Sequence, residues 1–376
     1  MIPEKLIFGF LTPSRYAIVY SIAGAGFGFF NSLLHLYFLG VDNAYIYFLL
    51  FQVSMVVYLT IDERYVNITW LAGNYGKVSV FGMMSVFLVG IIAYYSIVAF
   101  GAIEEDVYKY AFLSILLSFG VSFQNRVDAF FKSIATCDGY HRMKIVRIAS
   151  FPILFFLYAL SGIFLPISYY IPIIIILNLL VVLYLYFLVP GKSASSGLSM
   201  RFLLADSSIN AISGVMFYYI TRVWSAAYIS PQLYTALNFG WRFAGPAQHI
   251  IMRFRSTFYK VIGNLQLISI ILVSIFSIVF HIMDVQDSTL VMCAVVIIVA
   301  IDRSIQSSAR MFYMSMNRTS LVGERRYLIA ASVVSVSAIY FSYYSALSVV
   351  MIVVSFRGLV AYYHSKPTSS LVVSND

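Results

Sequence analysis

Apolar segments long enough to cross a lipid bilayer follow one another along almost the whole of this chain. A helix needs about 20 predominantly apolar residues to cross the hydrocarbon core of a bilayer. Hydrophobic residues make up 61% of the 376 positions and charged residues only 10%. The mean hydropathy is +0.89, and no soluble domain of this length has such a composition. The sequence therefore predicts an all-α polytopic membrane protein, with nearly all of the chain inside the bilayer.

Short polar joints divide the apolar sequence into twelve expected spans. Gly40-Val41-Asp42 is typical of a tight turn, and 73–76 of a loop. The segment 190–197 is the most linker-like and lies near the midpoint, so we expect two six-helix lobes, at residues 1–190 and 191–376. The spans are expected at residues 16–39, 43–66, 78–100, 107–132, 144–164, 168–189, 203–227, 231–258, 264–283, 288–312, 324–343 and 345–363.

Positive charges fall on alternate joints between these spans. With the N-terminus in the cytoplasm, the outer joints hold Lys109 alone, beside three acidic residues. Such an alternation follows the positive-inside rule and supports an even number of spans, with both termini in the cytoplasm. The cytoplasmic joints and flanks carry Lys5, Arg15, Arg64, Lys77, Arg142, Lys144, Arg147, Lys192, Arg201, Arg253, Arg255, Lys260, Arg318, Arg325, Arg326 and Lys366.

The two halves of the chain share residues at near-constant offsets. Matching residues relate the second span to the eighth and the fourth span to the tenth. Parallel repeats of this kind are related by a pseudo-two-fold axis along the membrane normal, and their substrate site lies between the halves near the midplane. The pairs are Tyr45 and Tyr234, and Arg64 and Arg253, at 189 residues; then Arg126 and Arg310, Gly139 and Gly323, and Arg142 and Arg326, at 184.

The eighth span carries a polar stripe that an ordinary lipid-facing helix would not hold. Arg242 lies roughly a third of the way along residues 230–260, too deep to reach the interface easily. Ionisable residues inside a membrane are costly and mark substrate or ion paths. The alternative is that Arg242 pairs with a buried acid for packing. The stripe covers about 140° of a helical wheel and consists of Tyr234, Asn238, Trp241, Arg242, Gln248, His249 and Arg253.

Two further arginines are candidate substrate ligands. Arg222 lies near the outer end of the seventh span beside Trp224 and Tyr228, so it is either an interfacial anchor or part of the site. Arg303 lies well inside the tenth span, next to Asp302. That pair of residues either forms a charge pair with another helix or contributes to the cavity.

Three titratable residues are candidates for binding a coupling ion. Asp206 and Asp302 lie inside the seventh and tenth spans, on polar faces. His35 shares a face of the first span with Gly24, Gly28 and Asn31. It is either a proton site or a helix-end histidine that is hydrogen-bonded to the backbone.

Three stretches resemble the multidrug/oligosaccharidyl-lipid/polysaccharide exporter superfamily. Residues 40–47 (GVDNAYIY) and 229–234 (ISPQLY), each followed by a span, are similar to the short outer turn of that superfamily, and residues 123–148 are similar to its basic segment after the fourth span. Within the superfamily the chain is most similar to Wzx-type O-antigen flippases, although it is shorter than many and lacks a lysine-rich lumen.

This resemblance implies two six-helix lobes around a cationic central cavity in the bacterial inner membrane. It implies that the substrate is an undecaprenyl-diphosphate-linked oligosaccharide, moved from the cytoplasmic to the periplasmic leaflet, and that Arg242 matches the arginine common in the eighth span. A polysaccharide polymerase and a chain-length regulator are the protein partners that it implies, together with membrane lipid.

Physical chemistry favours the same substrate class. Arginine binds a diphosphate by a planar fork and keeps its charge when desolvated, and tyrosine or tryptophan rings can stack on sugars. The alternatives are a cation or drug antiporter of the same fold, with Asp206 or Asp302 as the coupling acid, and a membrane polysaccharide polymerase. We expect a transporter without enzymatic activity or cofactor, because the sequence shows no nucleophile–histidine–acid set, phosphate loop or sizeable outer loop. The cysteines, Cys137 and Cys293, are isolated and suggest neither a disulfide framework nor a metal site. The net charge of +9 lies at helix ends and favours anionic lipid or substrate over nucleic acid.

Overall fold

The computed structural model describes residues 13–57, 107–134, 139–189, 222–223, 225–253, 255–282, 289–315 and 350, and the regular structure within them is helical throughout. Among these residues, three helical segments are long and apolar enough to cross a membrane: Ile18–Met55, His141–Phe164 and Ile167–Leu188. The described part of the chain is therefore an all-helical membrane protein.

The chain divides into two compact units, Met1–Val215 and Met216–Asp376. The linker-like segment 190–197 lies outside the described residues, so the lobe boundary expected after Pro190 stays a prediction.

The first helical element, α2 (Pro13–Val57), is two helices joined at one residue. Gly40 has φ 68° and ψ 177°, a conformation essentially confined to glycine. The rings of His35 and Tyr47 lie 4.9 Å apart across it, whereas a straight helix would separate residues twelve positions apart by about 18 Å. The chain therefore reverses at Gly40, where the sequence predicts a tight turn, and the first two spans lie side by side.

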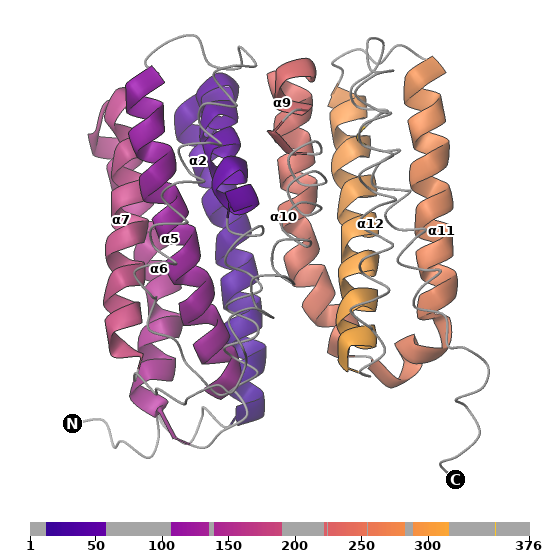
Figure 1. Cartoon of the computed structure of the whole chain (residues 1–376), viewed down its shortest axis with the longest axis horizontal. Coiled ribbons are helices and arrows are strands. Elements are labelled where there is room, and N and C mark those ends of the chain that lie inside the picture. The colour runs from indigo at the N-terminus through magenta and orange to yellow at the C-terminus, as the bar shows by residue number, and fades with distance from the viewer. Residues whose placement is uncertain are drawn as a thin grey trace, which may run out of the picture. The chain divides into compact units, whose positions relative to one another are not determined.

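Three more helices complete the described part of the first unit (Figure 1): α5 (Val107–Ile134), α6 (His141–Phe164) and α7 (Ile167–Leu188). Helix α2 packs on α5 and α6, and α7 packs on the same two helices. A cluster of buried side chains holds α2, α5 and α7 together, and it consists of Tyr16, Tyr20, Val127, Phe130, Phe131 and Leu185.

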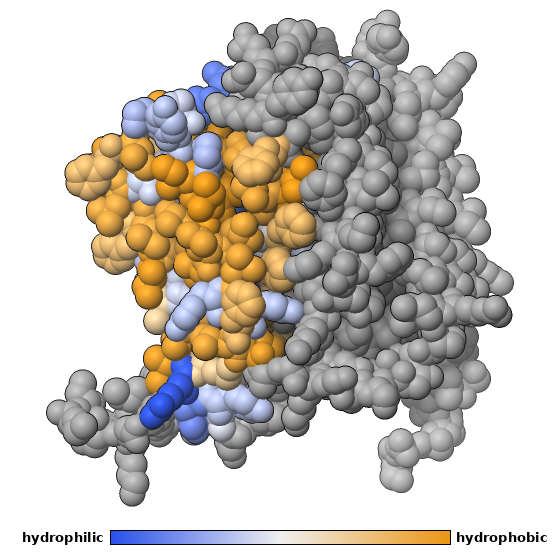
Figure 2. Space-filling view, turned by 60° about the vertical axis from the view of Figure 1, so that its left-hand side comes forward, coloured by the Kyte–Doolittle hydropathy of each residue, from blue (hydrophilic) through white to orange (hydrophobic). Residues whose placement is uncertain are grey.

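The outside of this unit is apolar, as a lipid-facing surface must be. Figure 2 shows a broad hydrophobic band over the described residues, with hydrophilic residues toward its lower end. Large apolar side chains of α6 and α7 are exposed along this surface, among them Ile153, Phe156, Leu160, Ile163, Ile176, Leu180, Tyr184 and Phe187. In water such a surface would aggregate, whereas in a bilayer it contacts acyl chains.

The second unit contains α9 (Ser225–Tyr228), α10 (Pro231–Arg253), α11 (Arg255–Ile282) and α12 (Thr289–Ser315). Helix α12 packs on both α10 and α11. A Cβ atom at Gly240 would lie 2.8 Å from Cβ of Val299 and 3.1 Å from the carbonyl oxygen of Val296. Glycine at this position therefore allows the backbones of α10 and α12 to approach closely.

The expected spans agree with the observed helices to within a few residues from the fourth to the sixth and at the start of the eighth. The main difference is at Arg253, where α10 ends several residues early, and α11 begins at Arg255. The spans expected at 78–100 and 324–343, most of 203–227 and all but one residue of 345–363 lie outside the described residues.

The same pair of spans packs together in each unit. Ser54, in the second half of α2, donates a hydrogen bond to the carbonyl oxygen of Ser114 in α5, at 3.4 Å. The corresponding helices of the other half, α10 and α12, meet at Gly240 and Val299. The helix pairs that the sequence offsets relate are therefore in contact within both units.

Candidate functional site

The start of α10 is fixed by its own sequence. Pro231 occupies the first helical position, where its missing N–H is harmless and its fixed φ suits a helix. The hydroxyl of Ser230 accepts a hydrogen bond of 3.3 Å from the backbone N–H of Leu233, which is the usual role of a serine cap. The helix that carries most of the predicted site therefore begins at a defined residue.

Arg222 contacts α10 at two points, and both involve predicted site residues. The hydroxyl of Tyr234 donates a 2.5 Å hydrogen bond to the backbone carbonyl of Arg222. The guanidinium carbon of Arg222 lies 4.6 Å from the centre of the Trp241 ring, in cation–π geometry. Arg222 is only 9% exposed and Tyr234 is fully buried. Arg222 thus packs against α10.

Asn238 is another predicted site residue of α10, and its side chain bonds to the backbone of the same helix. Its side-chain amide donates a 2.9 Å hydrogen bond to the backbone carbonyl of Tyr234, one turn earlier, and the residue is fully buried. The bond gives this buried amide group a hydrogen-bond partner within its own helix.

Arg242 lies at the middle of α10, as the twelfth of its 23 residues. It is half-buried, and its Nε and Nη2 atoms are inaccessible to solvent. The position is about 16 Å along the helix from Pro231, at 1.5 Å per residue. Pro246, one turn later, has no N–H to donate to the carbonyl of Arg242, and such a position tolerates a bend. A partly buried guanidinium therefore lies near the middle of α10.

Asp302 forms a separate pair with α11. The hydroxyl of Ser269 donates a 2.6 Å hydrogen bond to Oδ1 of Asp302, and both residues are buried. The neighbouring Arg303 is half-buried. The hydrogen bond from Ser269, a neutral residue, thus links Asp302 of α12 to α11. Asp302 can still either form a charge pair with another helix or contribute to the cavity.

His35 lies in the first unit, enclosed by tyrosines from three helical segments. Its Nδ1 atom shares a 3.1 Å hydrogen bond with the hydroxyl of Tyr170, and the imidazole is 2% exposed. The rings of Tyr47 and Tyr158 lie 4.9 and 5.1 Å away. The hydrogen bond at Nδ1 is thus to a side chain of α7 and not to backbone. Asp206 lies outside the described residues.

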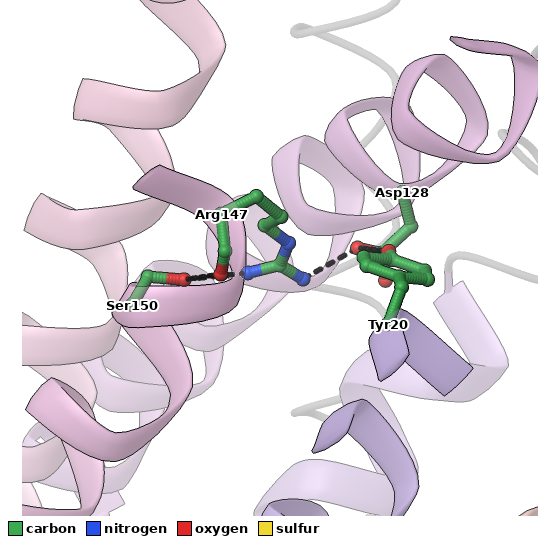
Figure 3. A network of polar contacts seen from close by, with 4 residues as sticks. All are labelled: Tyr20, Asp128, Arg147 and Ser150. Atoms are coloured by element: carbon green, nitrogen blue, oxygen red, sulfur yellow. Dashed lines mark hydrogen bonds and ion pairs between the residues drawn. The ribbon is translucent and has the colours of Figure 1, made fainter. Parts of the chain in front are cut away.

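A second charged group, in the first unit, was missed by reasoning from the sequence. Arg147 donates from Nη2 to Oδ1 of Asp128 at 2.5 Å and from Nη1 to the hydroxyl of Ser150 at 3.2 Å. Tyr20 donates to the same carboxylate oxygen at 2.7 Å, and Figure 3 shows the four residues converging from three helices. Lys144 is fully buried nearby, with its ammonium 5.1 Å from the ring centre of Tyr16.

The helical spacing of α6 contains the signal that could have found this group. Lys144, Arg147 and Ser150 recur every three residues and continue into Leu154 and Tyr158, so all five fall on one buried face of α6. The positive-inside rule counts such residues as solvated flanking charges because it considers only their place along the chain.

The structure thus links four of the predicted ligands by contacts: Arg222, Tyr234, Asn238 and Trp241. Arg242 directly follows Trp241 in the sequence. Asp302 and Arg303 lie on α12, which packs on α10. Within the described ranges, no group of three or more His, Cys, Asp or Glu residues is placed to hold a metal ion. Comparison of the chain with models of protein families, with curated proteins and with solved structures finds no match.

Proposed function

We propose that this chain is a flippase that moves an undecaprenyl-diphosphate-linked oligosaccharide from the cytoplasmic to the periplasmic leaflet by alternating access, driven by an ion gradient. The observation that supports this most directly is the half-buried Arg242 at the middle of α10. An ionisable residue at that depth is by default a functional residue.

A diphosphate head group matches the chemistry of this position. Arginine stays protonated when desolvated and offers two parallel N–H donors to a phosphate. Trp241, the neighbouring residue, is half-buried, and an indole ring of this kind can stack on a sugar. The prenyl chain needs only an apolar surface to slide along, as the lipid-facing residues of α6 and α7 provide.

The architecture that goes with this function is twelve spans in two six-helix lobes, related by an axis along the membrane normal. The agreement of the described helices with the expected spans supports it, as does the contact of α2 with α5 and of α10 with α12. In such repeat-built transporters the substrate binds where the lobes meet, near the midplane. The protein would lie in the bacterial inner membrane with both termini in the cytoplasm.

In this role the chain would act between enzymes of polysaccharide synthesis. The lipid-linked unit that it delivers would be the substrate of a polysaccharide polymerase, and a chain-length regulator would act at the same face. Both are candidate partners, and membrane lipid is the third.

One observation favours a second function. Asp302 is a buried acid on α12, the helix that packs against the one carrying Arg242. A buried carboxylate of this kind can bind a proton or a cation, as an antiporter for cationic compounds requires. In the flippase the same acid would couple transport to the ion gradient.

The test of the flippase is export of surface polysaccharide by cells that lack their own flippase. Arg242→Ala should lower export at least about tenfold, because each hydrogen bond to a charged partner contributes roughly 1.5–3 kcal/mol. Arg242→Lys keeps the charge but loses the planar fork, so partial export is expected. The protein in the membrane is quantified in parallel, and Arg142→Ala, at an exposed arginine of α6, is the matched control.

Normal export by an abundant Arg242→Ala protein would remove the arginine from the binding site. Loss of the variant protein from the membrane would instead identify Arg242 as part of a buried structural ion pair.

A further inference from the structure

We propose that Arg222 is a positioning residue that holds Trp241, and with it Arg242, at a fixed angle about the axis of α10, and that it does not itself bind the substrate. This inference rests on the proposed function, in which Arg242 meets the diphosphate. Under this proposal, some predicted ligands of the second unit contact the substrate, and Arg222 orients those residues.

Arg222 contacts two residues of α10, Tyr234 and Trp241, and we call this pair of contacts the clamp. Its backbone carbonyl accepts the hydrogen bond of Tyr234 at 2.5 Å, and its guanidinium carbon lies 4.6 Å from the Trp241 ring. Tyr234 and Trp241 are seven residues apart, which is about two turns and roughly 10.5 Å of helix, on the same face. One residue of the preceding segment therefore contacts α10 at both ends of a two-turn stretch.

Two contacts on one face fix the rotation of a helix. A turn of α10 about its axis would carry Tyr234 and Trp241 away from Arg222 together, and both interactions would be lost at once. Arg242 directly follows Trp241, so the direction of its side chain is set by the same two contacts.

Arg222 is poorly placed to receive a phosphate. It is 9% exposed, and its guanidinium is stacked on an indole. A substrate would have to displace that ring to bind the guanidinium. Trp241 and Arg242 are each half-buried and so more exposed than Arg222, although Nε and Nη2 of Arg242 are inaccessible to solvent. The arrangement thus assigns the anion to Arg242, the sugar to the indole of Trp241, and the alignment of both to Arg222.

The first experiment measures the clamp without any transport assay. The chain has three tryptophans, so Trp70→Phe and Trp224→Phe together leave Trp241 as the only indole. In the full-length protein in nanodiscs, adding Arg222→Ala should increase acrylamide quenching of Trp241 fluorescence. Arg222→Met should change it little, because a long, polarisable side chain also packs on an aromatic ring. Equal quenching with Arg222 and with Arg222→Ala would overturn the clamp.

The second experiment measures equilibrium binding of undecaprenyl diphosphate to the same proteins. Arg222→Ala should weaken binding by roughly two- to thirtyfold, the range that one cation–π contact supplies. Arg222→Met should weaken binding less than Arg222→Ala, because it loses the cation–π attraction but keeps the packing on the ring. If Arg222→Ala binds as tightly as the unmodified protein, the positioning role is wrong.

A double-mutant cycle gives the readout that separates positioning from direct contact. In a Trp241→Leu background, Arg222→Ala should have little further effect on binding, because the residue through which Arg222 acts is gone. An undiminished fold-loss in that background would overturn the proposal. Absence of diphosphate binding by the unmodified protein would contradict the proposed function, while the quenching experiment would still decide whether the clamp exists.

Discussion

Arg147 of α6 and Asp128 of α5 form a 2.5 Å ion pair in which the arginine side chain is 3% exposed and the aspartate side chain 24%. Tyr20 of α2 donates a hydrogen bond to the same carboxylate oxygen, at 2.7 Å. The guanidinium also lies 4.4 Å from the ring centre of Phe151. One carboxylate oxygen therefore joins three helices of the first unit.

Removing Asp128 should strongly destabilise this unit. Asp128→Ala leaves the Arg147 guanidinium buried without its carboxylate, which typically costs about 3–5 kcal/mol for a buried pair. The expected result is a clearly lower midpoint of thermal unfolding in detergent, and less protein in the membrane. The double variant Asp128→Ala with Arg147→Met should recover part of the loss, because replacing both partners by apolar groups avoids the unpaired charge.

Arg142→Ala is the control for that measurement, since Arg142 lies on α6 but is exposed. Its effect should stay within about 0.5 kcal/mol, as for most surface substitutions. An Asp128→Ala protein as stable as this control would mean that the ion pair contributes nothing to the fold.

Gly240 should not tolerate a methyl group. An added Cβ would lie 2.8 Å from Cβ of Val299, so α10 would have to move away from α12, at about 1–3 kcal/mol for overpacking. Gly240→Ala should therefore unfold at lower temperature and bind substrate less well, because Arg242 lies on the displaced helix. Gly26→Ala is the matched control: nothing lies within 4 Å of its Cβ position, and stability should be unchanged or slightly higher. Equal stability of the two variants would show that the close approach at Gly240 is unimportant.

The topology makes a prediction that needs no transport assay. Reporter fusions after Lys192 and after Lys366 should both be active in the cytoplasm, and a fusion after Asp284 should be active outside, because positive residues mark the cytoplasmic joints. A reversed result at any one of these positions would contradict two lobes of six spans.

Asp302 allows the charge to be removed with little change in packing. Asp302→Asn keeps an oxygen that can accept the hydrogen bond from Ser269, now 2.6 Å long, but it cannot bind a coupling cation or release a proton. If Asp302 is the coupling acid, the variant should fold normally and lose gradient-driven transport, because only a difference in ion affinity between two conformations can drive the change.

Ser269→Ala removes the hydrogen bond but keeps the carboxylate, and it is the control for local packing. Asp206→Asn is tested beside it. Full transport by both aspartate variants would eliminate both acids as coupling residues.

Within the described residues, the positions of most helices could be predicted from the sequence because bilayer thickness and charge both constrain them. The start of α10 at Pro231 follows from a serine–proline signal, and the reversal at Gly40 from a glycine in a short polar joint. The polar stripe of the eighth span also placed Tyr234 and Trp241 on one face, but it did not indicate that Arg222 packs against them.

Contacts between helices were harder to foresee. The sequence placed Arg222 beside aromatic residues that are near in the chain, whereas its ring partner is Trp241, nineteen residues away. Lys144 and Arg147 were counted with the cytoplasmic charges because they lie at the end of a span, yet they point into the bundle. His35 bonds to Tyr170, 135 residues distant, and the pairing of such residues depends on packing that no local pattern encodes.

The single residue that joins the two helices of α2 also limits how this protein can move. Within α2, Gly40 alone departs from helical geometry, so no flexible linker separates the first span from the second. The ring contact of His35 with Tyr47 also joins the two spans on either side of this turn. In the proposed flippase, we expect the two spans to move together as one rigid unit, with the hinge at another joint. An insertion that loosens this hairpin should then stop transport while leaving the remaining helices in place.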